Sequence, residues 1–155
     1  MRGTTNHPWS RPQENPDAIN SPGGTVIVQT ATGQTLVGDA VYASAAHTVT
    51  KSNTPADYKK FVGIVVGGTA TGMQVAETVG LVAANAGESL LIAISGIANA
   101  IADAPVAASA LLAGGAVTAG RLDDSASATA GQIVGLSLAA AGAAGDSFPI
   151  LIKHL

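Results

Sequence analysis

The chain has 155 residues and a formal net charge of -3, and its residues are 47% hydrophobic but only 3% aromatic and 11% charged. This length fits a single domain, and the seven lysines and arginines are scattered without forming a basic stripe, which argues against nucleic acid as a partner. The sequence contains no cysteine, which excludes disulfides, thiolate catalysis and cysteine-based zinc sites.

Residues 1–24 are predicted to form an extended arm ahead of a β-rich domain over residues 25–155. Repeated prolines deny the arm both helix and central strand. The arm contains Pro8, Pro12 and Trp9, and Trp9 is the only tryptophan of the chain. Two interpretations stay open. The arm is a loose terminus of the kind most domains have, or it docks on a neighbour with Trp9 as its anchor, because buried tryptophan is a frequent interface hot spot.

From Thr25 onward, short runs of β-branched and aliphatic residues alternate with glycine and polar turns, a pattern typical of a β-sandwich or β-barrel. Residues 73–84 fit one long strand or two pieces bent at Gly80, and Asn85–Glu88 is a predicted turn. Pro149 fits the beginning of a strand or an edge strand, because proline cannot donate to a ladder. The strands are expected at 25–30, 36–37, 40–42, 61–66, from 89 onward, 132–139 and 148–153.

One short α-helix is predicted over residues 103–113. Asp103 offers an acidic cap and Pro105 lies near the first turn, ahead of an alanine-rich run. Gly114 and Gly115 supply a stop signal. The predicted fold is therefore mainly β, a compact β-barrel or sandwich with one short α-helix and an extended N-terminal arm.

Alanine and glycine make up much of the apolar material, and this predicts assembly. A leucine or phenylalanine side chain contributes about 1.5–3 kcal/mol on burial, whereas an alanine buries little area beyond the backbone. A lone monomer of this composition would be thinly stabilised. We therefore expect an oligomer, or a protein that clamps onto a larger surface.

No arrangement of residues in the sequence predicts catalysis, a metal or a cofactor. The three histidines lie on the arm, in a loop and near the C-terminus, without ligand spacing. Asp39 follows Gly38, where turn chemistry explains an aspartate better than a catalytic role does. The glycine pairs lack the spacing of phosphate-binding loops. We expect a non-enzyme without cofactor or metal.

No targeting or membrane-spanning segment is expected either. Residues 1–24 are polar and proline-rich, the opposite of the apolar core of a signal peptide. The apolar run Ser89–Ala98 falls short of the roughly 20 residues needed to span a bilayer. It is predicted to be a buried strand, and a membrane is not expected among the partners.

One β unit occurs twice in weakened form. Val37–Tyr42 is followed by Phe61–Val65, and Ala113–Thr118 is likewise followed by Ile133–Ser137. Each copy reads as a short strand, a polar loop, and a second strand with glycine among aliphatic residues. This repetition predicts a β body with internal pseudo-symmetry.

Segments in this order resemble the capsid decoration, or cement, proteins of tailed bacteriophages. The resemblance covers about residues 25–153 and is carried by Gly38–Tyr42, Phe61–Ile64, Ile92–Ile97, Ala113–Val117, Ile133–Leu136 and Ala144–Asp146. It implies a small protein that trimerises on the outer surface of an icosahedral head, at three-fold and quasi-three-fold positions. There it would bridge neighbouring major capsid subunits and stabilise the shell. Made in the host cytoplasm, the protein would end in the virion. Gly115 departs from the pattern, since aspartate is common there.

The resemblance gives the arm no fixed role, and we hypothesise that two segments contact the capsid or another protomer. The candidate contact residues are Pro8, Trp9, Pro12, Tyr58, Lys59 and Lys60. The first three would reach from the arm to a capsid subunit or an adjacent copy of the chain. The last three lie in the polar loop 45–60, which either sits at a protomer contact or is simply solvated. The alternative function is a carbohydrate- or host-surface-binding β module on the virion, although sugar sites usually need aromatic platforms and this chain has few aromatic residues.

Overall fold

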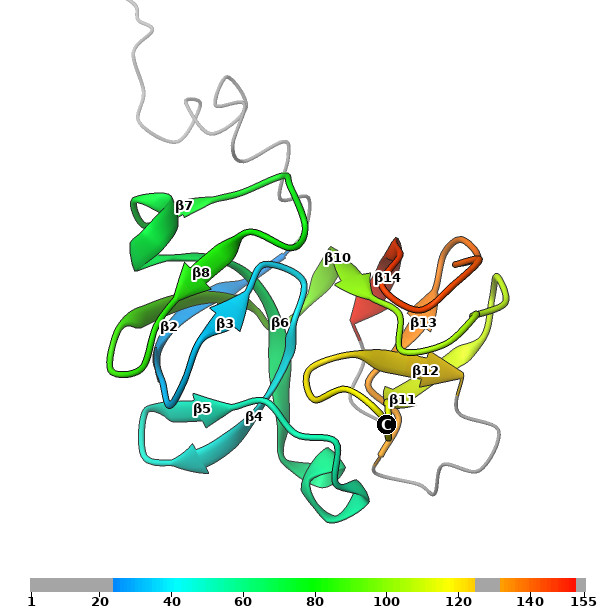
Figure 1. The fold of residues 1–155 in the computed structure, drawn as a ribbon, viewed down its shortest axis with the longest axis horizontal. Helices are drawn as coiled ribbons and strands as arrows, with labels where there is room; N and C mark the ends of the chain where they lie inside the picture. The colour runs from blue at the N-terminus through cyan, green and yellow to red at the C-terminus, as the bar shows by residue number, and fades with distance from the viewer. Residues whose placement is uncertain (1–23, 125–131, 153–155) are drawn as a thin grey trace, which may run out of the picture.

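The computed structural model describes residues 24–124 and 132–152, which consist almost entirely of strands and turns. The strands form two lobes that lie side by side in Figure 1, residues 24–93 in one and 96–152 in the other. Each lobe is a small ring of five strands. The predicted mainly β fold with internal duplication is therefore confirmed.

The first barrel closes on itself. Its five strands are β2 (Val26–Ala31), β4 (Ala40–Ala45), β5 (Thr48–Thr50), β6 (Phe61–Gly68) and β9 (Ser89–Ala93). They follow the order β4-β5-β2-β9-β6, and β4 also pairs with β6, which completes the ring. β7 (Gln74–Val75) extends the sheet beyond β6, while β3 (Thr35–Leu36) and β8 (Val82–Ala84) form a separate pair. Two short 3-10 helices, η2 (Pro55–Lys60) and η3 (Thr69–Thr71), flank β6.

The second barrel is built in the same way from the C-terminal half. Its five strands are β10 (Gly96–Ile101), β11 (Leu111–Gly114), β12 (Leu122–Asp124), β13 (Gly135–Ser137) and β14 (Ser147–Ile152). They follow the order β10-β14-β13-β11-β12. A parallel bridge between Ala102, just past β10, and Leu122 in β12 completes the ring.

The two barrels match strand for strand. β10, β11, β12, β13 and β14 take the places of β2, β4, β5, β6 and β9. In each ring of described strands, one contact is parallel, β2 with β5 in the first barrel and the Ala102–Leu122 bridge in the second. The other neighbouring strands in each ring are antiparallel. Identical pairing in both halves is what duplication of one β unit produces.

The duplication extends to single hydrogen bonds at the turns Asn85–Glu88 and Ala143–Asp146. The amide of Ala31 donates to the last carbonyl of the first turn at 2.8 Å, and the amide of Ala102 donates to the last carbonyl of the second at 2.9 Å. The third residue of each turn is a glycine, with φ of 82° and 91°. Such left-handed backbone favours glycine. The predicted turn at residues 85–88 is confirmed.

Two glycines in equivalent strands show why the repeat is visible in the sequence at all. A side chain on Gly63 in β6 would meet the backbone carbonyl of Ala93 in β9, and one on Gly135 in β13 would meet that of Leu151 in β14, at 2.8 Å. Close approach of a neighbouring backbone excludes a Cβ atom at both places. The predicted match of these two glycine-containing strands is confirmed.

The other half of the predicted repeat alignment is wrong. Val37–Tyr42 corresponds in the structure to residues 108–113 rather than to Ala113–Thr118. The amide of Gly38 donates to β6 at 2.8 Å and the amide of Ser109 donates to β13 at 3.0 Å, and both residues have positive φ. The glycines after residue 113 mislead because they serve close packing against other side chains instead of a repeated turn.

Residues 103–113 do not form the predicted helix. Val106 makes an isolated bridge, and the end of the segment is β11, which pairs on both sides. The carboxylate of Asp103 does accept backbone amides, but they belong to Val117 and Thr118, at 2.8 and 3.0 Å. An alanine-rich run favours helix by local propensity, yet the second barrel requires a strand between β12 and β13, and this pairing overrides propensity.

Other predicted elements are refined by the structure. The polar loop 45–60 contains the short strand β5 and the helix η2. The apolar run Ser89–Ala98 is divided between β9 and β10, and therefore contributes to both barrels. Residues 73–84 form the two pieces that the sequence allowed, β7 and β8, with Gly80 between them at a φ of 95°.

Pro149 is the third residue of β14, which is a central strand and not an edge strand. Its carbonyl accepts a hydrogen bond from the amide of Leu138 at 2.9 Å, just past the end of β13. The carbonyl and nitrogen of one antiparallel residue point to the same side. The nitrogen of Pro149 therefore faces residues past the end of β13, where no ladder hydrogen bond is lost because proline lacks an N–H group.

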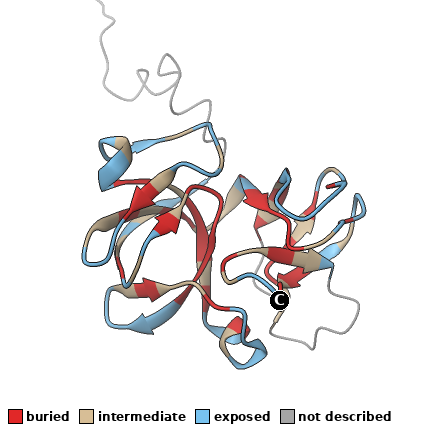
Figure 2. Ribbon diagram, viewed as in Figure 1, coloured by how far each residue is buried: buried red, intermediate tan, exposed pale blue. Residues whose placement is uncertain are grey.

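The buried residues form two clusters, and one of them joins the barrels. The first cluster fills the interior of the first barrel and includes Val41, Val65 and Leu90. The second cluster runs across the junction, where Ile64 of β6 belongs to the same core as Phe148 of β14. Figure 2 shows buried stretches along the strands of both lobes. The two barrels therefore share a hydrophobic core.

Candidate interaction site at the junction of the two barrels

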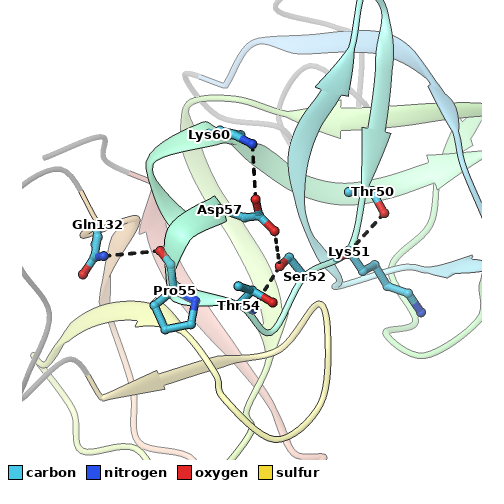
Figure 3. Close-up of polar contacts among 8 residues, drawn as sticks. All are labelled: Thr50, Lys51, Ser52, Thr54, Pro55, Asp57, Lys60 and Gln132. Carbon is cyan, nitrogen blue, oxygen red and sulfur yellow. Dashed lines mark hydrogen bonds and ion pairs between the residues drawn. The ribbon is translucent and has the colours of Figure 1, made fainter.

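The segment from Lys51 to Lys60 leads from β5 into β6 and touches the second barrel. The amide of Gly120 donates to the carbonyl of Ser52 at 3.3 Å, and the side chain of Asn53 donates to the carbonyl of Val117 at 3.4 Å. On the other side, Gln132 donates from Nε2 to the carbonyl of Pro55 at 3.3 Å (Figure 3). Polar contacts therefore tie this segment to the loop between β11 and β12 and to Gln132, which precedes β13.

Asp57 braces the segment from within. The Ser52 hydroxyl donates to Asp57 Oδ2 at 2.8 Å, and Lys60 Nζ lies 3.3 Å from Asp57 Oδ1 (Figure 3). The Thr54 amide donates to Ser52 Oγ at 3.0 Å. The hydrogen bond from Ser52, together with that from Lys60, lowers the pKa of Asp57 below its ordinary value. The segment is thus held in one conformation with Lys59 and Lys60 exposed to solvent.

The structure gives Tyr58 a place in the core instead of on the surface. Its ring is 5% exposed and lies against Gly114 of β11, while its hydroxyl donates to the carbonyl of Gly115 at 2.9 Å. Burial raises the pKa of Tyr58, and the nearby carboxylate of Asp103 raises it further. This ring fastens η2 to the second barrel. Of the three loop residues predicted to contact a partner, Lys59 and Lys60 are exposed, and for these two the contact stays a prediction.

Tyr42 lies beside Tyr58 and has an unusual hydroxyl. The two ring centroids are 5.8 Å apart, and the Phe61 ring packs edge-on against Tyr42 at the same centroid distance. The hydroxyl of Tyr42 is buried without a hydrogen-bond partner. Burial raises the pKa of Tyr42 strongly, so the phenol stays neutral in the folded chain.

Replacing Tyr42 with phenylalanine is therefore expected to raise the free energy of unfolding by about 1 kcal/mol, because an unsatisfied buried hydroxyl is destabilising. Tyr58→Phe removes a satisfied hydroxyl and should lower the same quantity by about 1 kcal/mol. Urea unfolding of both variants measures the two changes. Equal shifts of the two variants in the same direction would contradict this assignment of the hydroxyls.

The turn role expected for Asp39 is confirmed. Its Oδ2 accepts the amide of Leu36 at 2.8 Å and lies 3.6 Å from Lys51 Nζ. Burial raises the pKa of Asp39, and the hydrogen bond from Leu36 and the charge of Lys51 oppose that rise. The carboxylate holds the turn into β4, where Gly38 has a φ of 100°.

The arm residues Pro8, Trp9 and Pro12 lie outside the described residues, so their predicted contacts stay predictions. A hollow of about 360 Å³ lies between the first barrel and β10, the first strand of the second barrel. Its walls include Val26, Val75 and Ile97, and Glu77 is the titratable side chain among the lining residues. Over residues 24–124 and 132–152, no three His, Cys, Asp or Glu side chains gather closely enough to hold a metal ion. No helix in the described part of the chain is long and apolar enough to cross a membrane.

The sequence matches no protein-family model and no curated protein. Among solved structures, the fold is similar to that in a crystal structure of the N base of the head fiber gp8.5 of bacteriophage phi29. The TM-score is 0.51 at 10% sequence identity, and the match covers 84% of this chain and 94% of that chain. The shared property is the fold. The fold of this chain therefore resembles that of a phage head-fiber base.

Sequence reasoning missed a set of exposed apolar residues on the second barrel, which includes Ile97 and Leu111. The signal was present in the segments 85–94 and 143–152. Both read as a glycine, an acidic residue and a serine, followed by a continuous apolar run. Comparing these segments directly would have aligned the two barrels and shown which outward positions differ between them.

Proposed function

We propose that this protein is a structural component of a bacteriophage virion that binds the outer surface of the head as a homotrimer. There it bridges major capsid subunits and stabilises the shell. The observation that carries the proposal is the fold, which is shared with the base of a phage head fiber. The order of the β segments, which resembles that of capsid decoration proteins, supports the same function.

The placement of aromatic residues favours this proposal over a carbohydrate-binding module. Tyr42, Tyr58, Phe61 and Phe148 are all buried in the described part of the chain. A sugar-binding site usually needs an aromatic face open to solvent. These four rings instead pack in the core, and Trp9 lies outside the described residues.

A non-enzymatic role is part of the proposal. Three of the titratable groups with shifted pKa values, Asp39, Asp57 and Tyr58, have structural hydrogen-bond partners, and the fourth, Tyr42, is buried in the core. Asp39 holds a turn, Asp57 braces η2, and Tyr58 joins the two barrels. A catalytic site would bring such groups together around a reacting atom. A decoration protein needs only a rigid body and an adhesive surface.

The first test is the copy number of this chain in purified phage particles, relative to the major capsid protein. A ratio near one-to-one, lost under mild denaturation that leaves the shell intact, is the expected result. A handful of copies per particle would transfer the protein to a vertex or the tail and favour the receptor-binding alternative. Absence from the particle would refute the virion role.

Deleting residues 2–22 is expected to reduce capsid occupancy while leaving the barrels folded. The arm would otherwise contribute Pro8, Trp9 and Pro12 to the contact, and loss of a buried tryptophan anchor typically reduces affinity by about 2 kcal/mol or more. Binding to capsids stripped of this protein, measured by co-sedimentation, checks the prediction. Lys59→Ala/Lys60→Ala in the full chain tests the second predicted contact in the same assay. Unchanged occupancy of the deletion variant would exclude a role of the arm in binding.

A further inference from the structure

Four large apolar side chains form a continuous row across the outer face of the second barrel. The strand registers place Ile97 of β10 opposite Leu151 of β14, Leu151 opposite Leu136 of β13, and Leu136 opposite Leu111 of β11. Directly opposed residues of neighbouring strands project from the same face of a sheet. Ile97 is 51% exposed and Leu111 is 47% exposed, with two half-buried leucines between them. We refer to these four residues as the outer row.

The first barrel carries the same row at the equivalent positions. Val26 of β2 lies opposite Ala93 of β9, Ala93 opposite Ile64 of β6, and Ile64 opposite Ala40 of β4. Ala93, Ile64 and Ala40 are at most 5% exposed. They are covered because they belong to the core cluster that continues into the second barrel, through residues such as Ala98. The structure therefore shows what covers this face in one of its two copies, namely another barrel of the same kind.

The larger apolar side chains lie in the more exposed of the two rows, which is the opposite of what contact with solvent would favour. The row of the first barrel consists of Val26, Ala93, Ile64 and Ala40, of which only Val26 at its end is exposed, whereas the outer row of the second barrel consists of three leucines and one isoleucine. Single exposed apolar residues are ordinary on a protein surface, but a contiguous apolar row across four strands indicates an interaction surface. The outer row is thus suited to a partner that is absent from a single chain.

We propose that the outer row is covered by the first barrel of a second copy of this chain. The contact repeats between chains the relation that the two barrels already have within one chain. Such a contact joins different surfaces of the two copies, so it is head-to-tail, and it closes into a ring when the rotation allows. A closed ring fits the trimer proposed above. The contact itself does not rest on the capsid role, because it forms between free chains.

The test compares the oligomeric state of purified full-length chains by size exclusion with light scattering, across about 1–100 µM, because self-association depends on concentration. The native chain is expected to be an oligomer. Ile97→Lys/Leu111→Lys should raise the dissociation constant at least about tenfold, because burying two unpaired charges opposes the contact. Far-UV circular dichroism should be unchanged, since both side chains already face solvent in the single chain.

The matched control is Val28→Lys/Val117→Lys, which adds the same charge at positions that are 54% and 80% exposed and lie outside the outer row. It should remain oligomeric. A native chain that stays monomeric throughout the range overturns the proposal, as does a row variant that associates like the native chain, or a control that dissociates equally. If the lysine pair does not fold, Ile97→Thr/Leu111→Thr, which keeps strand propensity, decides the question by the same criteria. A monomeric row variant that still binds capsids would leave the proposed contact standing and show that the capsid role is independent of it.

Discussion

Replacing Gly63 with alanine is expected to lower the free energy of unfolding by about 3 kcal/mol, because overpacking against a fixed backbone forces strands apart. The new Cβ atom would meet the carbonyl oxygen of Ala93, and it would also lie 2.8 Å from the Cγ2 atom of Ile92. A carbonyl within a β ladder cannot move aside as the end of a flexible side chain can. The pairing of β6 with β9 would have to shift along the wall of the first barrel.

Urea unfolding measures this loss of stability, and substitutions at two further glycines serve as comparisons. Gly135→Ala, at the equivalent place in the second barrel, should have the same sign and a smaller size, since the nearest carbonyl would be 2.8 Å away. Gly33→Ala introduces a Cβ atom with nothing within 4 Å and should change stability by no more than about 0.5 kcal/mol. Equal stability of Gly63→Ala and Gly33→Ala would show that β6 and β9 are not packed as closely as the structure indicates.

Tyr58→Ala is expected to destabilise the chain by about 3–5 kcal/mol, the usual range for removing a large buried aromatic side chain. The substitution removes the ring that packs on Gly114 and on the Tyr42 ring, and with it the hydrogen bond to Gly115. These contacts fasten η2 of the first barrel to β11 of the second. The barrels should therefore also lose part of their coupling.

The expected signature of that loss is a change in the shape of unfolding as well as its midpoint. The native chain should unfold in one transition, because one core cluster spans both barrels. Tyr58→Ala should broaden the transition or divide it in two. The adjacent Lys59→Ala is the control, since its exposed side chain should shift stability by no more than about 0.5 kcal/mol. A Tyr58→Ala variant as stable and as cooperative as the native chain would contradict a shared core.

These two sites hold the molecule together at two levels. A Gly-mediated close approach locks β6 against β9 within one barrel, and the Tyr58 ring locks the barrels together. Alanine-rich strands bury little area in each barrel, so the junction supplies core that neither half has alone. The same shortage of core within a single chain supports the inference that the outer row is covered on assembly.

Much of the fold could be predicted from local sequence, because turns and strand runs are encoded by neighbouring residues. Phe61–Gly68 reads as a strand from its β-branched and aliphatic residues, and Asn85–Glu88 reads as a turn from its glycine. Gly63 and Gly135 revealed the duplication, since the same close approach of a carbonyl selects glycine in both barrels.

The candidate site was less predictable, because it depends on contacts between distant segments. The loop around Tyr58 was predicted as a surface, yet the ring is buried by Gly114 and Gly115, which are far from it in sequence. Residues 103–113 favoured a helix by composition, and strand pairing with β12 and β13 overrode that preference. Propensity acts within a few residues, whereas pairing is decided by the partner strand.

The sequence by itself determined a mainly β, duplicated body without cysteine and rich in alanine and glycine. Only the tertiary structure decided how the two copies differ. Equivalent outward positions have different surroundings, because Ile64 is fully buried in the core shared with the second barrel whereas Leu136 is only half-buried in the outer row. A strand pattern encodes which residues share a face, but burial of that face depends on how whole barrels pack, and this is set by non-local contacts such as that between Tyr58 and Gly115.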